Sequence, residues 1–104
     1  MSTEKTQIIE MIDKLQNVVD LFYQQNDNEA FTEFELLIDN IENSINILQE
    51  YANQYLGFEV DEEKIYNILN EAMVALEEGD KVLMADILQY EFIEYIKELL
   101  VKMQ

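Results

Sequence analysis

The chain has 104 residues, of which 23 are acidic and 6 are basic, so its formal net charge at pH 7 is −17. It contains no Cys, His, Trp or Pro and only two Gly, while 49% of its residues are hydrophobic. These figures predict one folded domain over residues 1–104, because disordered chains combine high net charge with few large apolar side chains.

The absent residue types remove most reactive groups. Without His or Cys, the common zinc sites, di-iron sites built on Glu-x-x-His, and serine or cysteine nucleophiles with a histidine base are excluded. All six basic residues are lysines, so no guanidinium group is present for bidentate phosphate recognition. We therefore expect a protein that is not an enzyme, with no catalytic residue, no cofactor and no metal site.

The acidic excess predicts repulsion from nucleic-acid phosphates and from anionic membrane surfaces. The first six residues lack the apolar core of a secretory signal, and no uncharged run is long enough to span a bilayer. We expect a cytoplasmic protein that binds neither nucleic acid nor membrane. The charge favours a solvated outer face that steers the chain toward a basic protein partner, with a nucleic-acid mimic that inhibits a basic protein as an alternative.

Apolar side chains recur at spacings of three and four along four segments, which predicts four amphipathic helices. They cover about residues 3–25, 27–56, 62–78 and 81–102. The continuity of the long second helix stays open, because its asparagines are mediocre helix formers. Short turns between the segments predict an all-α fold, a single antiparallel bundle of four helices.

Several residues mark the ends of these helices. Asn26 and Glu29 have the spacing of a capping box at the start of the second helix. Asp61 and Asp80 are predicted to be the N-caps of the third and fourth helices. The two glycines follow the second and third helices, where a left-handed C-terminal cap belongs.

The apolar stripe of the third helix should face the core, and so should one broad face of the fourth helix. The stripe of the third helix is Ile65, Ile68, Leu69, Ala72, Met73 and Leu76. At 100° per residue, the core face of the fourth helix is Val82, Ala85, Leu88, Phe92, Ile93, Ile96, Leu99, Leu100 and Met103.

A second, narrower apolar stripe on the fourth helix carries the functional hypothesis. Leu83, Ile87 and Tyr90 either pack against neighbours on both sides as core, or line an exposed groove or dimer face. Asp86 either accepts a hydrogen bond from a tyrosine or another helix, or is solvated at the edge of the polar face. The candidate partner-binding residues are Leu83, Asp86, Ile87, Tyr90 and Glu94.

Three aromatic residues near the end of the second helix, Tyr51, Tyr55 and Phe58, also have two interpretations. They belong to the core or its rim, or they project together as a rigid aromatic anchor for a partner.

The segment from Leu76 to Glu91 includes the pattern Gly-Asp-x-Val-Leu-x-Ala-Asp-x-Leu-x-Tyr-Glu. It resembles a segment of small uncharacterised helical proteins of low-GC Gram-positive bacteria, often encoded near flagellar or surface-glycosylation genes. The expected architecture is also similar to that of the flagellar export chaperones, which cover aggregation-prone ends of filament or cap proteins. The segment resemblance implies no known activity, the likeness to export chaperones implies a link to the flagellum, and neither assigns any residue a function.

The sequence therefore predicts a non-enzymatic acidic helical adaptor, or an export-chaperone-like protein, that binds a partner protein. That partner is expected to be basic or to present an amphipathic helix. The alternative is a self-associating structural or regulatory homodimer that uses the same stripe of the fourth helix.

Overall fold

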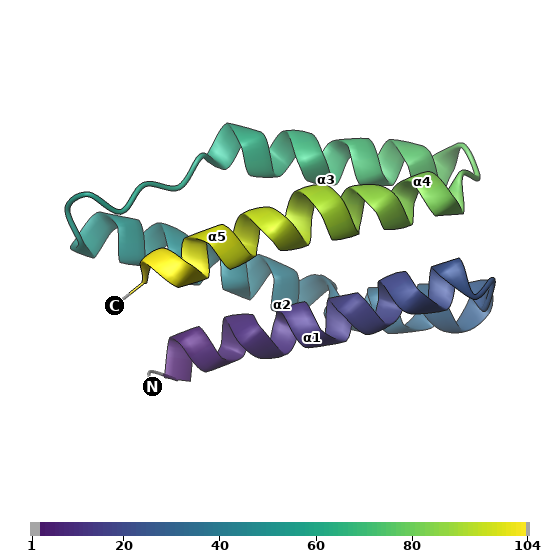
Figure 1. The fold of residues 1–104 in the computed structure, drawn as a ribbon, viewed down its shortest axis with the longest axis horizontal. Coiled ribbons are helices and arrows are strands. Elements are labelled where there is room, and N and C mark those ends of the chain that lie inside the picture. The colour runs from purple at the N-terminus through teal and green to yellow at the C-terminus, as the bar shows by residue number, and fades with distance from the viewer. Residues whose placement is uncertain (1–2, 104) are drawn as a thin grey trace.

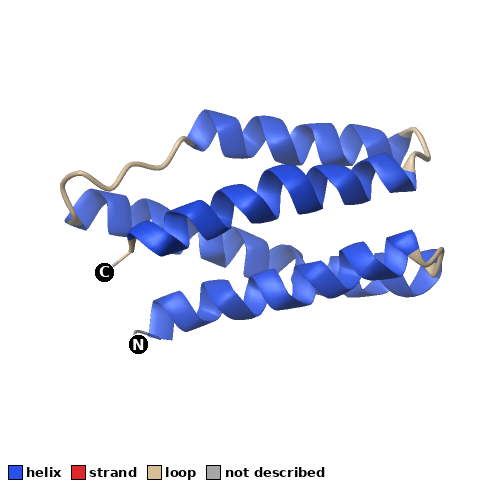
Figure 2. Ribbon diagram, in the orientation of Figure 1, coloured by secondary structure: helices blue, strands red, loops and turns tan. Residues whose placement is uncertain are grey.

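Four helical rods, each running opposite to the one before it, build the molecule (Figure 1). The computed structural model describes residues 3–103. The first three rods are α1 (Thr3–Tyr23), α2 (Asp27–Gln54) and α3 (Glu62–Glu77). The fourth rod consists of α4 (Lys81–Asp86), η1 (Ile87–Ile93) and α5 (Glu94–Lys102), which follow one another without a break. Figure 2 shows helices joined by loops and no strand within the described residues, so the predicted all-α fold is confirmed.

Hydrogen bonds between side chains fix the direction of the first rod relative to the fourth. Gln16 bonds to Gln89 at 3.1 Å, and the Tyr23 hydroxyl donates to the Asp86 carboxylate. From the first bond to the second, the residue number on α1 rises from 16 to 23 while that on the fourth rod falls from 89 to 86. The first and fourth rods are therefore antiparallel. At the end where both helical hairpins turn, the Lys81 ammonium lies 2.9 Å from an Asp27 carboxylate oxygen.

The core lies where α1 packs on α2, where α3 packs on α4 and η1, and where α1 packs on the same two elements. Its largest fully buried side chains come from all four rods: Phe22, Phe92, Ile8, Met11, Leu15, Leu48, Ile65, Met84, Leu88, Ile93, Ile96 and Leu99. The seam between α2 and α3 is not one of these close contacts within the described residues. The helices α2 and α3 are therefore packed less closely against each other than these pairs of elements.

The predicted aspartate caps are confirmed. The Asp61 side chain accepts a hydrogen bond from the Lys64 backbone N–H at 3.0 Å, and Asp80 accepts one from the Leu83 N–H at 3.0 Å. Each carboxylate satisfies a backbone donor that the first helical turn leaves without a partner. These two caps fix where α3 and α4 begin.

The helix ends differ in part from the prediction. Gly57 and Gly79 have φ angles of 93° and 78°, the left-handed region that glycine adopts without a steric cost. The capping box at Asn26 and Glu29 was wrong, because Asn26 makes no side-chain cap bond to α2. Its side-chain amide donates instead to the Gln24 side-chain oxygen at 3.3 Å.

The helix α2 is one continuous α-helix of 28 residues, so its asparagines do not interrupt it. Near its C-terminal end, Tyr51 of α2 and Phe58 of the following loop are buried with ring centroids 4.7 Å apart, and Tyr55 stacks on Tyr51 while staying 48% exposed. Two of the three aromatic residues are therefore core. On α3, Met73 is 40% exposed, so its placement in the buried stripe was wrong.

The fourth rod contains a π-helical segment, η1, which the sequence analysis did not predict. A π-helix bonds residue i to i+5 instead of i+4, so it inserts a residue and rotates the two flanking α-helical halves by about 100° relative to each other. The uniform helical wheel therefore misplaced residues before the insertion. Val82, predicted to be core, is 57% exposed, whereas Met84 is fully buried and Ile87 is 6% exposed.

No helix found within residues 3–103 combines the length and the apolar character that a transmembrane span requires.

Candidate functional site

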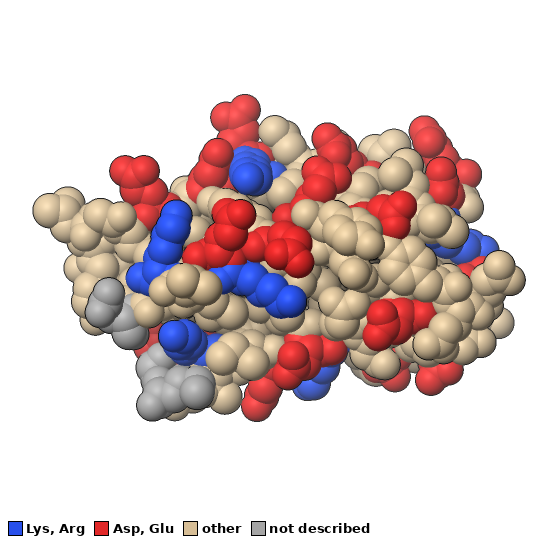
Figure 3. Space-filling view, viewed as in Figure 1, with Lys and Arg blue, Asp and Glu red and all other residues tan. Residues whose placement is uncertain are grey.

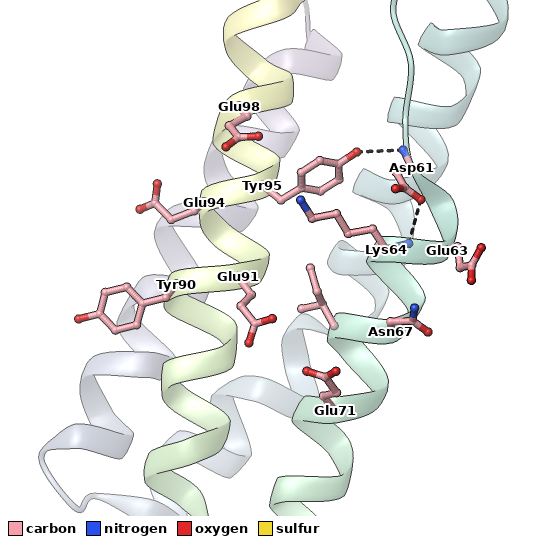
Figure 4. A pocket seen from close by; sticks show the side chains of 11 residues that line it. Asp61, Glu63, Lys64, Asn67, Glu71, Tyr90, Glu91, Glu94, Tyr95 and Glu98 are labelled. Carbon is pink, nitrogen blue, oxygen red and sulfur yellow. Dashed lines mark hydrogen bonds between the residues drawn. The ribbon is translucent and has the colours of Figure 1, made fainter.

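The five candidate residues of the fourth rod do not form one surface. Leu83 and Tyr90 are exposed at 44% and 65%, but Ile87 lies in the core. Of the two interpretations of the second apolar stripe, the core interpretation therefore applies to Ile87, and the exposed interpretation applies to Leu83 and Tyr90. Tyr90 and Glu94 both point away from α3 (Figure 4).

Asp86 is half-buried and joins the fourth rod to the first. Its carboxylate accepts the hydrogen bond from the Tyr23 hydroxyl of α1, so it is not simply solvated. Loss of hydration, followed by the hydrogen bond to the negatively charged Asp86, raises the pKa of the Tyr23 phenol above its ordinary value of 10.0. Asp86 therefore links α1 to α4 through one of its carboxylate oxygens.

The hydrogen bond between Tyr23 and Asp86 predicts that the Tyr23 phenol ionises at a higher pH than a free tyrosine does. Since the folded-state pKa of Tyr23 lies above the unfolded value, its contribution to stability is complete below pH 10.0 and is lost as pH rises through the folded-state pKa. In a spectrophotometric titration, Asp86→Asn should lower the pKa of Tyr23 because it removes the neighbouring charge. Tyr23→Phe should remove the late phase altogether, and a late phase that survives in this variant would contradict the assignment.

An acidic groove lies between α3 and the helix formed by η1 and α5 (Figure 4). Its volume is about 580 Å³. Acidic side chains are scattered over the face shown in Figure 3, with lysines among them. The residues that line it are Asp61, Glu63, Lys64, Asn67, Ile68, Glu71, Tyr90, Glu91, Glu94, Tyr95 and Glu98.

Contacts inside the acidic groove hold the helices together. The Asp61 backbone N–H donates to the Tyr95 hydroxyl oxygen at 2.9 Å, and the Lys64 ammonium lies 4.4 Å from the centroid of the Tyr95 ring. Across the described part of the chain, no three carboxylates come close enough to hold a metal ion. The lysine and the tyrosine of the acidic groove thus have structural roles at the start of α3.

A second groove follows the seam between α2 and α3, and it is predominantly apolar. Its volume is about 460 Å³. The residues that line it are Phe34, Ile38, Ile41, Glu42, Ile45, Asn46 and Gln49 from α2, and Tyr66, Leu69 and Met73 from α3. We call it the α2–α3 groove.

Helical spacing aligns the apolar side chains of the α2–α3 groove into two facing rows. On α2 the row advances by three or four residues from Phe34 to Ile45, and on α3 it runs from Tyr66 to Met73. Phe34 is nearly buried at the floor, whereas Ile38, Tyr66 and Met73 are 41%, 63% and 40% exposed. Ile41 is also buried at 6%, so the groove exposes Ile38 on α2 and Tyr66 and Met73 on α3.

A family profile described as Domain of unknown function (DUF8042) matches residues 3–102. The chain belongs to the DUF8042 family. The match covers all four rods, so both grooves lie within the DUF8042 region. No curated protein and no solved structure matches the chain.

The α2–α3 groove of this DUF8042 chain was not among the sites predicted from the sequence. A signal was present, because apolar residues of α2 follow two adjacent rows instead of one: a buried row with Leu37 and Leu48, and the groove row with Phe34 and Ile45. A stripe this broad exceeds what a single neighbour covers. Only the tertiary structure shows that Ile38 in this second row stays 41% exposed, while Phe34 and Ile41 of the same row are buried.

Proposed function

We propose that this chain is a non-enzymatic, cytoplasmic adaptor or export-chaperone-like protein that binds an amphipathic helix of a partner protein. The observation that carries the proposal is the α2–α3 groove, whose two apolar walls are left without a covering helix. Exposed apolar surface of this kind marks interaction sites on soluble domains. The absence of His, Cys and Arg from the sequence supports a binding role over a catalytic one.

The dimensions of the groove favour a helix as its occupant. From Phe34 to Gln49 the α2 wall extends about 22 Å at 1.5 Å per residue, which matches about four turns of a partner helix. Helix-in-groove recognition uses anchors at i, i+3 or i+4 and i+7, and both walls present apolar residues at that spacing. Tyr66 also has the rigid, amphipathic ring that dominates binding energy at many interfaces.

The proposed function predicts that a glutamate substituted into the groove will weaken binding of a partner helix without unfolding the chain. The probe is a synthetic helix with a leucine stripe at spacings of three and four and uncharged polar residues elsewhere. Because Ile38 and Met73 are partly exposed, Ile38→Glu and Met73→Glu should change stability by less than about 0.5 kcal/mol. Each should weaken binding by about 2 kcal/mol, or about thirtyfold in Kd, measured by fluorescence anisotropy.

The matched control is Leu36→Glu. Leu36 is an exposed apolar residue of the same helix, at 70%, and does not line the groove. It should leave the Kd unchanged. Equal losses of binding affinity in Leu36→Glu and Ile38→Glu would contradict the proposal. So would a failure of the natural chain to bind the probe helix. Light scattering at moderate salt addresses the dimer alternative, because a stable dimer that Ile38→Glu dissociates would assign the groove to self-association.

A further inference from the structure

The two walls of the α2–α3 groove differ from the rest of the chain in their charge. The helix α2 carries seven acidic residues and no lysine. The helix α3 carries four acidic residues and one lysine, Lys64, whose ammonium group lies over the Tyr95 ring in the acidic groove. No basic side chain therefore lines the α2–α3 groove among the described residues.

One carboxylate lies within the groove itself. Glu42 lines it, one residue after Ile41, and Asn46 and Gln49 follow at spacings of four and three along the same helix. This row borders the apolar row and changes along its length from a carboxylate to two uncharged amides. Glu42 makes no salt bridge shorter than 4.0 Å within residues 3–103, so its charge faces solvent.

We propose that the occupant of the α2–α3 groove is a basic amphipathic helix that places a Lys or Arg against Glu42. This inference rests on the proposed function and names the chemistry of the partner. The apolar rows supply the contact area, while Glu42 and the acidic field of both walls select the charge at the edge of the bound helix. Such a field also raises the association rate of a cationic partner and is screened by salt.

The same charge argues against a second copy of this chain as the occupant. Each copy carries a net charge of −17, and among the described residues the one charged side chain that lines the groove is the carboxylate of Glu42. Packing the groove of one copy on another would bring like charges together, which costs free energy at an interface. A basic heterologous helix relieves that repulsion instead.

The experiment compares three probe helices that share the leucine stripe and differ at its two edges, which carry lysine, glutamine or glutamate. The natural chain should bind the lysine helix about fivefold to tenfold more tightly than the glutamine helix, and the preference should shrink as salt rises. Glu42→Lys should weaken binding of the lysine helix by a similar factor. The same variant should tighten binding of the glutamate helix, which restores a complementary pair.

Glu50→Lys is the matched control, because it makes the same change of net charge on an exposed residue of α2 that does not line the groove. Equal Kd values for the lysine and glutamine helices, or equal effects of Glu42→Lys and Glu50→Lys, would overturn the inference and leave the proposed function intact. Tight binding of the lysine helix to Ile38→Glu would place it outside the groove and also overturn the inference. Failure of the glutamine and lysine helices alike to bind would overturn the proposed function itself.

Discussion

Replacing Phe92 by alanine is expected to lower the free energy of unfolding by about 3 to 5 kcal/mol. Phe92 is fully buried in η1, which packs against both α1 and α3. Removal of the ring loses apolar burial and leaves a cavity where these rods meet. Since a loss of 1 kcal/mol lowers Tm by about 4 to 8 °C in domains of this size, thermal unfolding followed by circular dichroism should show a fall above about 12 °C.

The control is Tyr90→Ala, in the same π-helical segment. Tyr90 is 65% exposed, so this variant should change stability by less than about 0.5 kcal/mol. Both substitutions remove an aromatic ring from η1, and they differ chiefly in burial. Similar losses of stability in the two variants would show that η1 is destabilised by removal of either ring, whether buried or exposed. That result would contradict the packing described for Phe92.

Ile87→Asp is expected to be severely destabilising, while Leu83→Asp is expected to be tolerated. An aspartate at 87 places a carboxylate in the core without a partner, which should cost about 3 kcal/mol or more. At 83, where the side chain is 44% exposed, the same carboxylate stays hydrated and should cost less than about 1 kcal/mol, mostly through helix propensity. Urea unfolding measures both.

Alanine variants at the same two positions keep the comparison quantitative if Ile87→Asp fails to fold. Ile87→Ala should lose about 2 to 4 kcal/mol and Leu83→Ala less than about 1 kcal/mol. Equal stability of the two alanine variants would contradict the burial of Ile87. It would also restore the hypothesis that Leu83, Ile87 and Tyr90 form one exposed stripe.

Local features of the fold were predictable because each depends on a few neighbouring residues. Asp61 and Asp80 cap their helices through their own first turns, and Gly79 supplies the left-handed conformation directly after the C-cap of α3. Gly57 is also left-handed, but it lies two residues beyond Tyr55, the C-cap of α2. Asn26 shows the limit of this reasoning, because its side chain found a local partner in Gln24 instead of the helix. The capping pattern was present without the capping bond.

The candidate site was harder to predict, since it depends on which helix faces lack a neighbour. The stripe on the fourth rod was derived from a uniform α-helical wheel, and the π-helical insertion in η1 changed the phase of the rod. Asp86 found its donor on α1, 63 residues away in sequence. Ile38 and Met73 lie on separate helices, and only their joint exposure along the α2–α3 seam makes a groove.

By itself, the sequence determined the fold class, the number of rods, the turn positions and the class of chemistry that is excluded. These follow from apolar periodicity, capping residues, glycine positions and the absence of His, Cys and Arg, all of which act locally or through composition. The tertiary structure alone decided that Ile87 is core, that Asp86 bonds to Tyr23, and that α2 and α3 leave an apolar groove between them. The physical reason is that burial depends on how rods are rotated and spaced against one another, and one inserted π-helical residue changes that rotation by about 100°.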